Sequence, residues 1–535
     1  MWWDERLSGE IHTNEASTSS PAGGKGKAGK PDKKAERAAQ RGKSAAAMTQ
    51  ADPSDPLKDQ YGDTELVASQ ANSHRVWSQI EACSPSKEGE KLLLRGRVHT
   101  VRGKGKSCFL VLRQRTSTLQ LVMFADDKVV SKGMVKYASL LPRESVIDVE
   151  GTVFVPKDPV QGCSQSETEL HVISIRCISR AEALPFEVVD ASRSEQQLKA
   201  ADTQLVTVAV DTRLENRCID LRTPANQAIF TLQSKVCQLF REALTAEGFT
   251  EIHSPKLIAG ASEGGAAVFK LDYMGQPACL AQSPQFYKQM ALAADMRRVF
   301  ELGPVFRAEN SNTHRHLCEF TGLDFEMEIN EHYSEVLDVL DHLFVYMFNG
   351  LRAACAKQLA VINEQYPFEP LEYLPQTLRL PFEEGIKMLQ EDGLDVDPLG
   401  DLNTEAERRL GALVKAKHHT DFFILYRYPL AIRPFYTMPD PTDARWSNSF
   451  DVFIRGEEII SGAQRVHDAT LLTERAKVHE IPVDSIHGYL DSFKYGMPPH
   501  GGAGVGLERV VMLFCGLDNI RKTSLFPRDP RRLSP

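Results

Sequence analysis

Between residues 91 and 178 the sequence alternates apolar and polar residues in five short runs. The runs are KLLLRGRVHTV, SCFLVLRQR, STLQLVMFA, ESVIDVEGTVFV and ELHVISIRCI. Alternation over such lengths is typical of β-strands with one face in a core. A helix-like stretch, DKVVSKGMVKYASL, lies between the third and fourth runs. Five strands with one helix in that position follow the plan of a five-stranded OB-fold β-barrel, although other small barrels give similar alternation.

The first strands of this predicted barrel carry an uneven charge pattern. Residues 91–115 contain eight Lys or Arg and no acid, and Phe109 lies on the same predicted strand face as Val111 and Arg113. An aromatic ring in a basic strand surface suits the stacking of an unpaired base above a groove that follows phosphates. Burial of Phe109 in the barrel core is the alternative. The pattern therefore favours a nucleic-acid surface and leaves the second reading open.

The N-terminal residues differ in composition from the rest of the chain. They are rich in Ala, Gly, Ser and Lys and have hardly any apolar periodicity after Trp3, so we expect residues 1–60 to form a basic extension that is disordered or partly helical. Residues 21–47 hold eight Lys or Arg and two acids, whereas the whole chain has a formal charge of −9. A basic arm on an acidic body indicates a polyanionic partner, and a solvated tail is the alternative.

The sequence also bears on the compartment. No apolar stretch approaches the roughly 18 to 20 residues that span a bilayer, and the N-terminus lacks a basic segment followed by an apolar one. The closest of the ten cysteines, Cys163 and Cys177, lie fourteen residues apart, so zinc-ligand spacing is absent. We therefore expect a cytoplasmic protein with reduced thiols and no membrane partner.

The C-terminal part of the chain mixes strand and helix patterns. A length of 535 residues favours at least two domains, and a linker over residues 181–225 separates the barrel over residues 61–180 from residues 226–535. The strand patterns there are FTEIHSP, AVFKLDY, RVFELGPVFRAE, FTGLDFEMEI and SFDVFIRGEEIISGA. Runs of strands broken by a helical insertion indicate an α+β domain whose antiparallel sheet is flanked by helices. Neither a P-loop nor a Rossmann fingerprint is present.

Helical periodicity supplies the flanking elements. An amphipathic helix is predicted from Asn226 to about Glu247, and a longer one begins at Ser334. Within a helical insertion over about residues 334–420, the helix TEAERRLGALVKAKH is predicted to open with a capping box, in which Thr404 caps the first turn and Glu407 reaches back.

Three segments after the linker over residues 181–225 resemble the sequence motifs of the class II aminoacyl-tRNA synthetases. The helix, strand and proline over about residues 226–255 resemble motif 1, FRAENSNTHRHLCEF and FTGLDFEME within residues 300–328 resemble motif 2, and GGAGVGLERVVM within residues 501–515 resembles motif 3. AQSPQFYKQ, SEGGAAVF and EEIISGAQR are similar to the aspartyl branch of eukaryotes and archaea. The resemblance covers essentially residues 90–535. It implies an OB-fold anticodon-binding domain in front of a class II catalytic domain.

The reaction implied by this resemblance is the attack of a carboxylate on the α-phosphorus of ATP. Such a reaction accumulates negative charge and needs positioned cations rather than a protein nucleophile. The resemblance assigns catalysis to Arg307 and Arg509, although a lone strand arginine is more commonly a surface ion pair. The residues implied to bind ATP are Arg307, Glu309, His316, Phe320, Glu458, Gly506 and Arg509.

Acidic residues beside a polyphosphate imply a divalent cation. Hard oxygen ligands suit Mg²⁺, and the implied ligands are Glu458, Ser461 and Asp451, read as members of one strand. An exposed acidic sheet edge is the alternative. Aspartate would need fixed cations in its pocket, which the resemblance assigns to Lys288 and Arg465. The remaining implied aspartate-binding residues are Ser262, Glu263, Gln285, Asp324 and Ser461.

The resemblance also implies an RNA partner and a second copy of the chain. The implied tRNA-binding residues are Phe109, Gln120 and Glu169 in the barrel, Ser311 and Thr313 in motif 2, and Lys33, Lys34 and Arg37 in the N-terminal extension. Pro255 is expected at a homodimer interface. The expected function is ligation of L-aspartate to tRNA(Asp) with ATP and Mg²⁺. The alternatives are an enzyme that also charges tRNA(Asn) and a catalytically silent RNA-binding scaffold, and association with other synthetases stays open.

Overall fold

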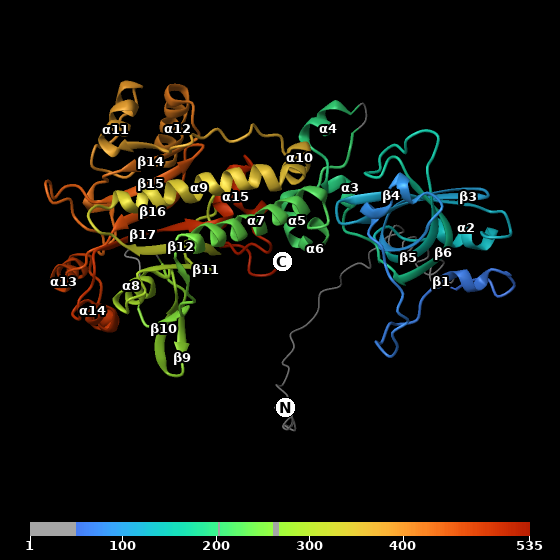
Figure 1. The fold of residues 1–535 in the computed structure, drawn as a ribbon, viewed down its shortest axis with the longest axis horizontal. Helices are drawn as coiled ribbons and strands as arrows, with labels where there is room; N and C mark the ends of the chain where they lie inside the picture. The colour runs from blue at the N-terminus through green and yellow to red at the C-terminus, as the bar shows by residue number, and fades with distance from the viewer. Residues whose placement is uncertain (1–49, 202–203, 261–266) are drawn as a thin grey trace, which may run out of the picture. The chain divides into compact units, whose positions relative to one another are not determined.

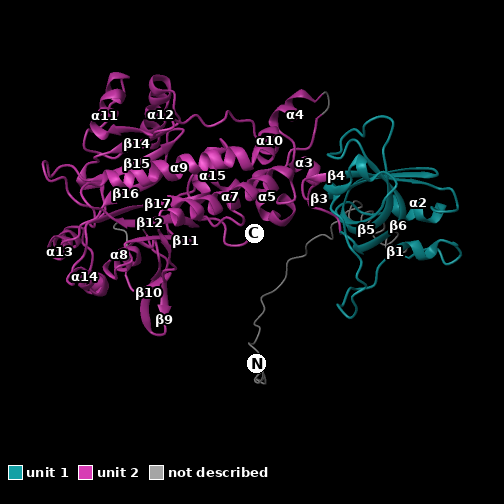
Figure 2. Ribbon diagram, in the orientation of Figure 1, with its two compact units in different colours: residues 1–113, 118–181 teal, residues 114–117, 182–535 magenta. Residues whose placement is uncertain are grey.

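The computed structural model of the protein describes residues 50–201, 204–260 and 267–535. This part of the chain divides into two compact units, shown in Figure 2. Unit 1 extends to residue 113 and includes residues 118–181, and unit 2 comprises residues 114–117 and 182–535. The lysines and arginine proposed for the N-terminal extension lie outside the described residues, as do Ser262 and Glu263.

Unit 1 is a closed β-barrel, and its strands form where the sequence predicts them. The elements are β1 (Tyr61–Asp63), β2 (Lys91–Lys104), β3 (Ser107–Gln114), β4 (Ser117–Phe124), α2 (Lys132–Ser139), β5 (Val146–Phe154) and β6 (Glu169–Ser179), with 3-10 turns η1 (Lys58–Gln60), η2 (Ile80–Ala82) and η3 (Pro85–Lys87). The strand order is β1-β6-β4-β3-β2-β5, and β5 also pairs with β6, which closes the barrel. The short strand β1, parallel to β6, adds to the five that alternation predicts.

The barrel core consists of the residues that alternate inward. Leu94 and Val98 on β2 and Leu110 and Leu112 on β3 are fully buried. α2 covers this core, and the Ser131 side chain accepts a hydrogen bond from the Met134 N–H at its N-terminus. Removing each of these apolar side chains from water stabilises the barrel by about 1.5 to 3 kcal/mol.

Unit 2 begins with four short helices in the segment predicted as a linker. They are α3 (Val188–Ala191), α4 (Glu195–Ala200), α5 (Val210–Glu215) and α6 (Arg217–Asp220). The large sheet of this unit has the order β13-β14-β15-β16-β17-β12-β11-β7. Its strands are β7 (Thr250–Glu251), β11 (Arg298–Phe306), β12 (Glu319–Glu328), β13 (Leu378–Pro381), β14 (Phe422–Tyr426), β15 (Ser449–Ile454), β16 (Glu457–Gln464) and β17 (His500–Gly506).

Helices pack on this sheet, as Figure 1 shows. α7 (Pro224–Ala246) and α9 (Ser334–Ala354) lie side by side, and their apolar faces form one core with α15 (Leu507–Phe514) and the sheet. The other helices are α8 (Gln285–Ala293), α10 (Ala356–Gln365), α11 (Phe382–Glu391), α12 (Thr404–His418), α13 (Ala469–Val478) and α14 (His487–Phe493), with η4 (Leu430–Ile432), η5 (Val483–Ile486) and η6 (Ile520–Lys522). A small sheet contains β8 (Leu257–Ile258), β9 (Lys270–Tyr273) and β10 (Gln276–Leu280). The α+β fold class is confirmed.

Two local predictions are wrong. The N-cap of α12 is Asn403, whose side chain accepts a hydrogen bond from the Ala406 N–H, so Thr404 is not the cap. The segment predicted as one strand over residues 449–463 is a hairpin, because Arg455 and Gly456 adopt φ values of 51° and 73° and reverse the chain. No helix in the described ranges is long and apolar enough to cross a membrane.

Candidate active site

A cavity of about 370 Å³ lies over the centre of the large sheet. Register places Asp324 of β12 opposite Gly504 of β17, and Gly504 opposite Ser461 of β16. These residues form one row across three strands, and a Cβ on Gly504 would lie 3.0 Å from the Asp324 Oδ1 atom. Eleven residues predicted from the sequence line this cavity: Gln285, Arg307, Glu309, His316, Phe320, Asp324, Glu458, Ser461, Arg465, Gly506 and Arg509.

Two predicted arginines reach the cavity from different elements. Arg307 follows β11 directly, and its guanidinium carbon lies 5.6 Å from the centre of the Phe320 ring. Arg509 is in the first turn of α15, where its Nη1 donates to the Glu458 carbonyl over 2.9 Å and its Nη2 donates to the Arg315 carbonyl over 3.2 Å. Burial lowers the pKa of Arg509, and Glu458 opposes this effect. Within the described ranges, neither of these two arginines forms an ion pair, whereas Arg465, which also lines the cavity, pairs with Glu326 at 2.8 Å.

The predicted metal ligands come from two strands rather than one. Asp451 on β15 lies opposite Ser461 on β16, and both accept hydrogen bonds from Arg433. Arg433, which sequence reasoning missed, binds Asp451 bidentately over 2.9 and 2.8 Å. Burial, with added repulsion from Asp451, raises the pKa of Glu458 to about 7. Among the three predicted ligands, Asp451 and Ser461 accept hydrogen bonds from Arg433, and Glu458 lines the cavity.

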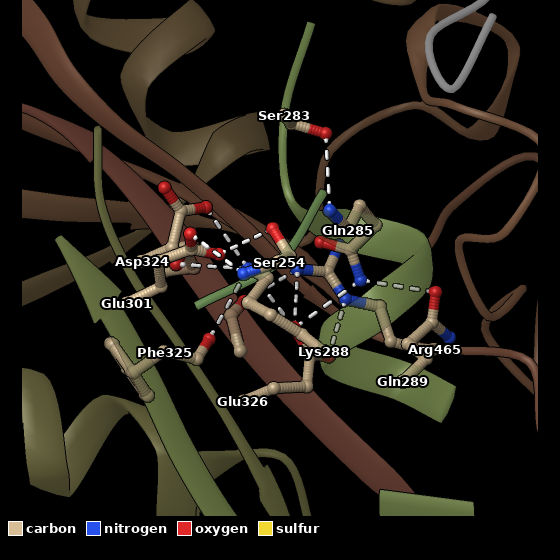
Figure 3. Close-up of polar contacts among 12 residues, drawn as sticks. Ser254, Ser283, Gln285, Lys288, Gln289, Glu301, Asp324, Phe325, Glu326 and Arg465 are labelled. Atoms are coloured by element: carbon tan, nitrogen blue, oxygen red, sulfur yellow. Dashed lines mark hydrogen bonds and ion pairs between the residues drawn. The ribbon is translucent and has the colours of Figure 1, made fainter. Parts of the chain in front are cut away.

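The pocket predicted for the amino acid contains a buried charge network, shown in Figure 3. Lys288 is fully buried; its Nζ lies 3.1 Å from Asp324 Oδ1 and 3.3 Å from Glu326 Oε2. Arg465 donates to Glu326 over 2.8 Å, and Gln285 donates to the same carboxylate over 3.2 Å. Lys288 therefore lies behind the acids, and it is not among the described residues that line the cavity.

Glu326 is the centre of this network, and sequence reasoning missed it. It lies two residues after Asp324 on β12, so both carboxylates point to the same face of the strand. This spacing of two residues along a predicted strand is the sequence signal that could have identified Glu326. Burial favours the protonated form of Glu326, but Arg465 and Lys288 together lower its pKa. Burial raises the pKa of Asp324 despite the contact with Lys288.

The loop of motif 2, residues 307–318 between β11 and β12, orients a histidine toward the cavity. The Nδ1 atom of His316 lies 2.5 Å from the Thr313 hydroxyl and 3.4 Å from the Ser311 hydroxyl. Burial and the neighbouring Arg509 lower the pKa of His316, so the neutral ring is favoured.

Pro255 is exposed between β7 and β8.

The barrel residues predicted to bind RNA lie on β3, β4 and β6 of unit 1. Phe109 is half-buried and packs edge-to-face against Phe124 at 5.7 Å. Gln120 and Glu169 are register partners on β4 and β6 and bond over 2.9 Å. Arg113 is buried and paired with Glu144 at 2.7 Å, so its predicted place on an exposed basic surface is wrong. Arg113 keeps the alternation of β3 and lies on the face opposite Leu110 and Leu112, where the segment that carries Glu144 covers it.

Comparisons with known proteins agree with this geometry. The family described as class II tRNA synthetases (D, K and N) matches residues 209–530, and an OB-fold nucleic acid binding domain of the tRNA anti-codon type matches residues 92–178. The chain is 55% identical over 499 residues to the cytoplasmic aspartate–tRNA ligase 2 of Arabidopsis thaliana, covering 90% of this chain and 89% of that protein.

Two further relatives extend the similarity. The cytoplasmic aspartate–tRNA ligase of Homo sapiens is 51% identical over 482 residues, covering 90% of this chain and 96% of that protein. The aspartyl-tRNA synthetase structure from Entamoeba histolytica has a TM-score of 0.82 and 44% identity, covering 89% of this chain and 96% of that one. With its barrel, its antiparallel sheet and its arginine-lined cavity, the chain belongs to the class II aminoacyl-tRNA synthetases, in the aspartate–tRNA ligase branch.

Proposed function

We propose that the chain activates L-aspartate with ATP to form aspartyl-adenylate and then transfers aspartate to the 3′ end of tRNA(Asp) in the cytoplasm. The observation that carries the proposal is one cavity bordered by Arg307 and Arg509 on one side and by the network around Glu326 on the other. The first group suits a polyphosphate, and the second suits a small zwitterion with an extra carboxylate. The cytoplasmic names of the relatives support the compartment.

Activation joins two bound substrates without a covalent enzyme intermediate. An oxygen of the aspartate α-carboxylate forms a bond to the α-phosphorus, and the bond from that phosphorus to the bridging oxygen breaks as pyrophosphate leaves. Arg307 would hold both the α-phosphate and the attacking carboxylate, because a guanidinium presents two parallel donors. Arg509 would contact the γ-phosphate, and Phe320 would stack on adenine while Glu309, His316 and Gly506 complete the nucleotide site.

Aspartate would be selected by charge. Arg465 lines the cavity and would meet the side-chain carboxylate, while Lys288 balances Asp324 and Glu326 from behind. Asp324 and Gln285 would accept the α-ammonium group, together with Ser262 and Glu263. Asparagine would offer Arg465 a neutral amide in place of a carboxylate, and a hydrogen bond between two charged groups is the stronger one.

Mg²⁺ fits the acidic side of the cavity. Glu458 and Ser461 would hold it, whereas Asp451 would ligate it only by releasing its bidentate contact with Arg433. Mg²⁺ prefers oxygen ligands and keeps several waters or phosphate oxygens, so few protein ligands suffice. The ion would neutralise phosphate charge. The place of Glu458 in the cavity lining supports this assignment.

The proposed division of labour follows the two units. Residues 61–180 would read the anticodon through Phe109, Gln120 and Glu169, residues 181–225 would act as a hinge, and residues 226–535 would catalyse. Ser311 and Thr313 would meet the acceptor end. The basic extension would add phosphate contacts through Lys33, Lys34 and Arg37. Pro255, exposed after β7, would lie in a homodimer interface.

One assay tests the function. ATP–pyrophosphate exchange is measured with each of the twenty amino acids, followed by charging of purified tRNA(Asp) and tRNA(Asn). We expect exchange with aspartate alone, and Arg307→Ala should lower it at least about 100- to 1000-fold, the effect of removing a comparable transition-state donor. Exchange by no amino acid would identify a silent scaffold. Charging of both tRNAs would identify a non-discriminating enzyme.

A further inference from the structure

The motif 2 loop is held on two sides by side chains from distant parts of the chain. On one side lies η6, near the C-terminus, and on the other lies α12 of the helical insertion. The two contacts reach different residues of the loop. They therefore allow its tip and its cavity side to be controlled separately.

Arg521 of η6 holds the loop tip. Its Nη1 donates to the Thr313 carbonyl over 3.0 Å, and its Nη2 donates to Asn312 Oδ1 over 2.7 Å. Its Nε donates to Asp529 over 2.6 Å, so all three guanidinium nitrogens are used, and the side chain is buried. Within the described part of the chain, Arg521 is the only side chain that bonds Asn312.

The position of Arg521 is itself fixed by the helices that precede the catalytic core. Arg217 of α6, paired with Asp220 at 2.5 Å, donates to the carbonyls of Arg521, Ser524 and Leu525 over 3.2, 2.8 and 3.0 Å. A buried arginine that bonds three carbonyls of one segment makes that segment a rigid support. Arg521 thus links this segment to the exposed loop tip through its hydrogen bonds to Asn312 and Thr313.

The cavity side of the loop has an independent anchor. Arg315 lines the cavity, and its Nη1 donates to Glu407 of α12 over 2.5 Å. The Arg315 carbonyl accepts from Arg509 over 3.2 Å. Arg521 takes part in neither of these two contacts. Glu407 takes part in neither contact to Asn312 and Thr313.

We propose that Arg521 is a positioning residue for the transfer of aspartate to tRNA, and that Glu407 is the corresponding positioning residue for ATP. Arg521 holds the loop tip, residues 312 and 313, where the 3′ end of tRNA arrives, and Glu407 holds Arg315 over the triphosphate. This inference rests on the proposed function. Neither residue touches the reacting atoms.

The test compares two half-reactions in matched variants. Lysine cannot reproduce the hydrogen bonds of the guanidinium to Asn312 and Thr313 together, so Arg521→Lys should lower kcat/KM for tRNA about tenfold or more while ATP–pyrophosphate exchange stays within about threefold. Glu407→Gln should affect the other half-reaction, and should raise KM for ATP in pyrophosphate exchange by about fivefold or more. Gln233→Leu is the control, because Gln233 bonds the Thr523 carbonyl of the same segment over 2.8 Å and does not contact the loop.

A second measurement protects the test against misfolding. Asn312 is exposed, so Asn312→Ala removes the loop partner without disturbing the core. If Arg521 acts through Asn312, the effects of Arg521→Lys and Asn312→Ala on charging should not add. Parallel loss of exchange and charging in Arg521→Lys, or no loss of charging in either variant, overturns the proposal. Failure of the wild-type protein to exchange pyrophosphate with aspartate would instead refute the proposed function.

Discussion

At the scale of single residues, the pocket proposed for the amino acid is a balance of buried charges. Two cations, Lys288 and Arg465, face two carboxylates, Asp324 and Glu326, and each of these side chains is at most 6% exposed. Buried charges are tolerated only when paired, and removal of one partner commonly costs about 3 to 5 kcal/mol. The pocket should therefore respond to substitution through specificity as well as stability.

Lys288→Met should shrink the preference for aspartate over asparagine. We expect the ratio of the two kcat/KM values in pyrophosphate exchange to fall by about tenfold or more, because the loss of positive charge penalises the carboxylate and not the amide. Lys415→Met is a control, since Lys415 of α12 pairs with Asp421 at 3.0 Å and takes no part in this network. A constant ratio with parallel losses would mean that Lys288 positions ATP or the loop.

Glu508 should give stability a measurable pH dependence. This buried residue accepts the Thr321 N–H over 3.0 Å, and burial raises its pKa from 4.5 to about 7. Between these values the folded protein holds a proton that the unfolded chain has lost, so the free energy of unfolding falls as pH rises. The free energy of unfolding of the wild type should change between pH 5 and pH 8 in urea titrations, and Glu508→Gln should remove up to about 3 kcal/mol of that change. An identical slope in the variant would contradict the assignment.

At the scale of elements, α12 is a capped helix whose side chains also bond the motif 2 loop. Its first turn is capped by Asn403, and its side chains Glu407 and Arg408 bind the motif 2 loop through Arg315 and His314. Helix ends left without a cap expose unsatisfied backbone N–H groups. The cap therefore stabilises the helix that positions the loop.

Asn403→Ala should lower the stability of unit 2 by about 1 kcal/mol, the usual effect of losing an N-cap. Thr404→Ala should change it much less, although the sequence alone predicts Thr404 as the cap. Thermal unfolding of the two variants beside the wild type decides between them. Equal losses would show that Asn403 is not the dominant cap.

At the scale of the whole molecule, charge is unevenly distributed along the chain. The formal net charge is −9, yet residues 21–47 carry eight Lys or Arg and two acids. Such an arm raises the affinity for a polyanion through phosphate contacts whose strength depends on salt.

Deletion of residues 1–48 should weaken tRNA binding and leave aspartate activation unchanged. Each lost phosphate contact should lower the slope of log affinity against log salt by about 0.7 to 0.9. Filter binding over a salt series measures the slope, and pyrophosphate exchange is the control. An unchanged slope would assign the extension to another partner.

Local sequence determined the elements of this protein and the positions of its motifs. Alternation predicted the five main barrel strands, and helical periodicity predicted α12 over residues 404–418. Both patterns depend on neighbours two to four residues apart, which the sequence displays directly. The motifs likewise predicted eleven residues that strands, helices and the motif 2 loop bring to one cavity.

Only the tertiary structure decided which charged side chains meet. Glu407, expected to close a local capping box, binds Arg315, which is 92 residues away. Arg433 reaches Asp451 from a separate loop, and Arg521 reaches the motif 2 loop from near the C-terminus. A long charged side chain pairs with an opposite charge that lies nearby in space, and that charge can be on another strand or loop. That proximity is set by register and packing rather than by spacing along the chain.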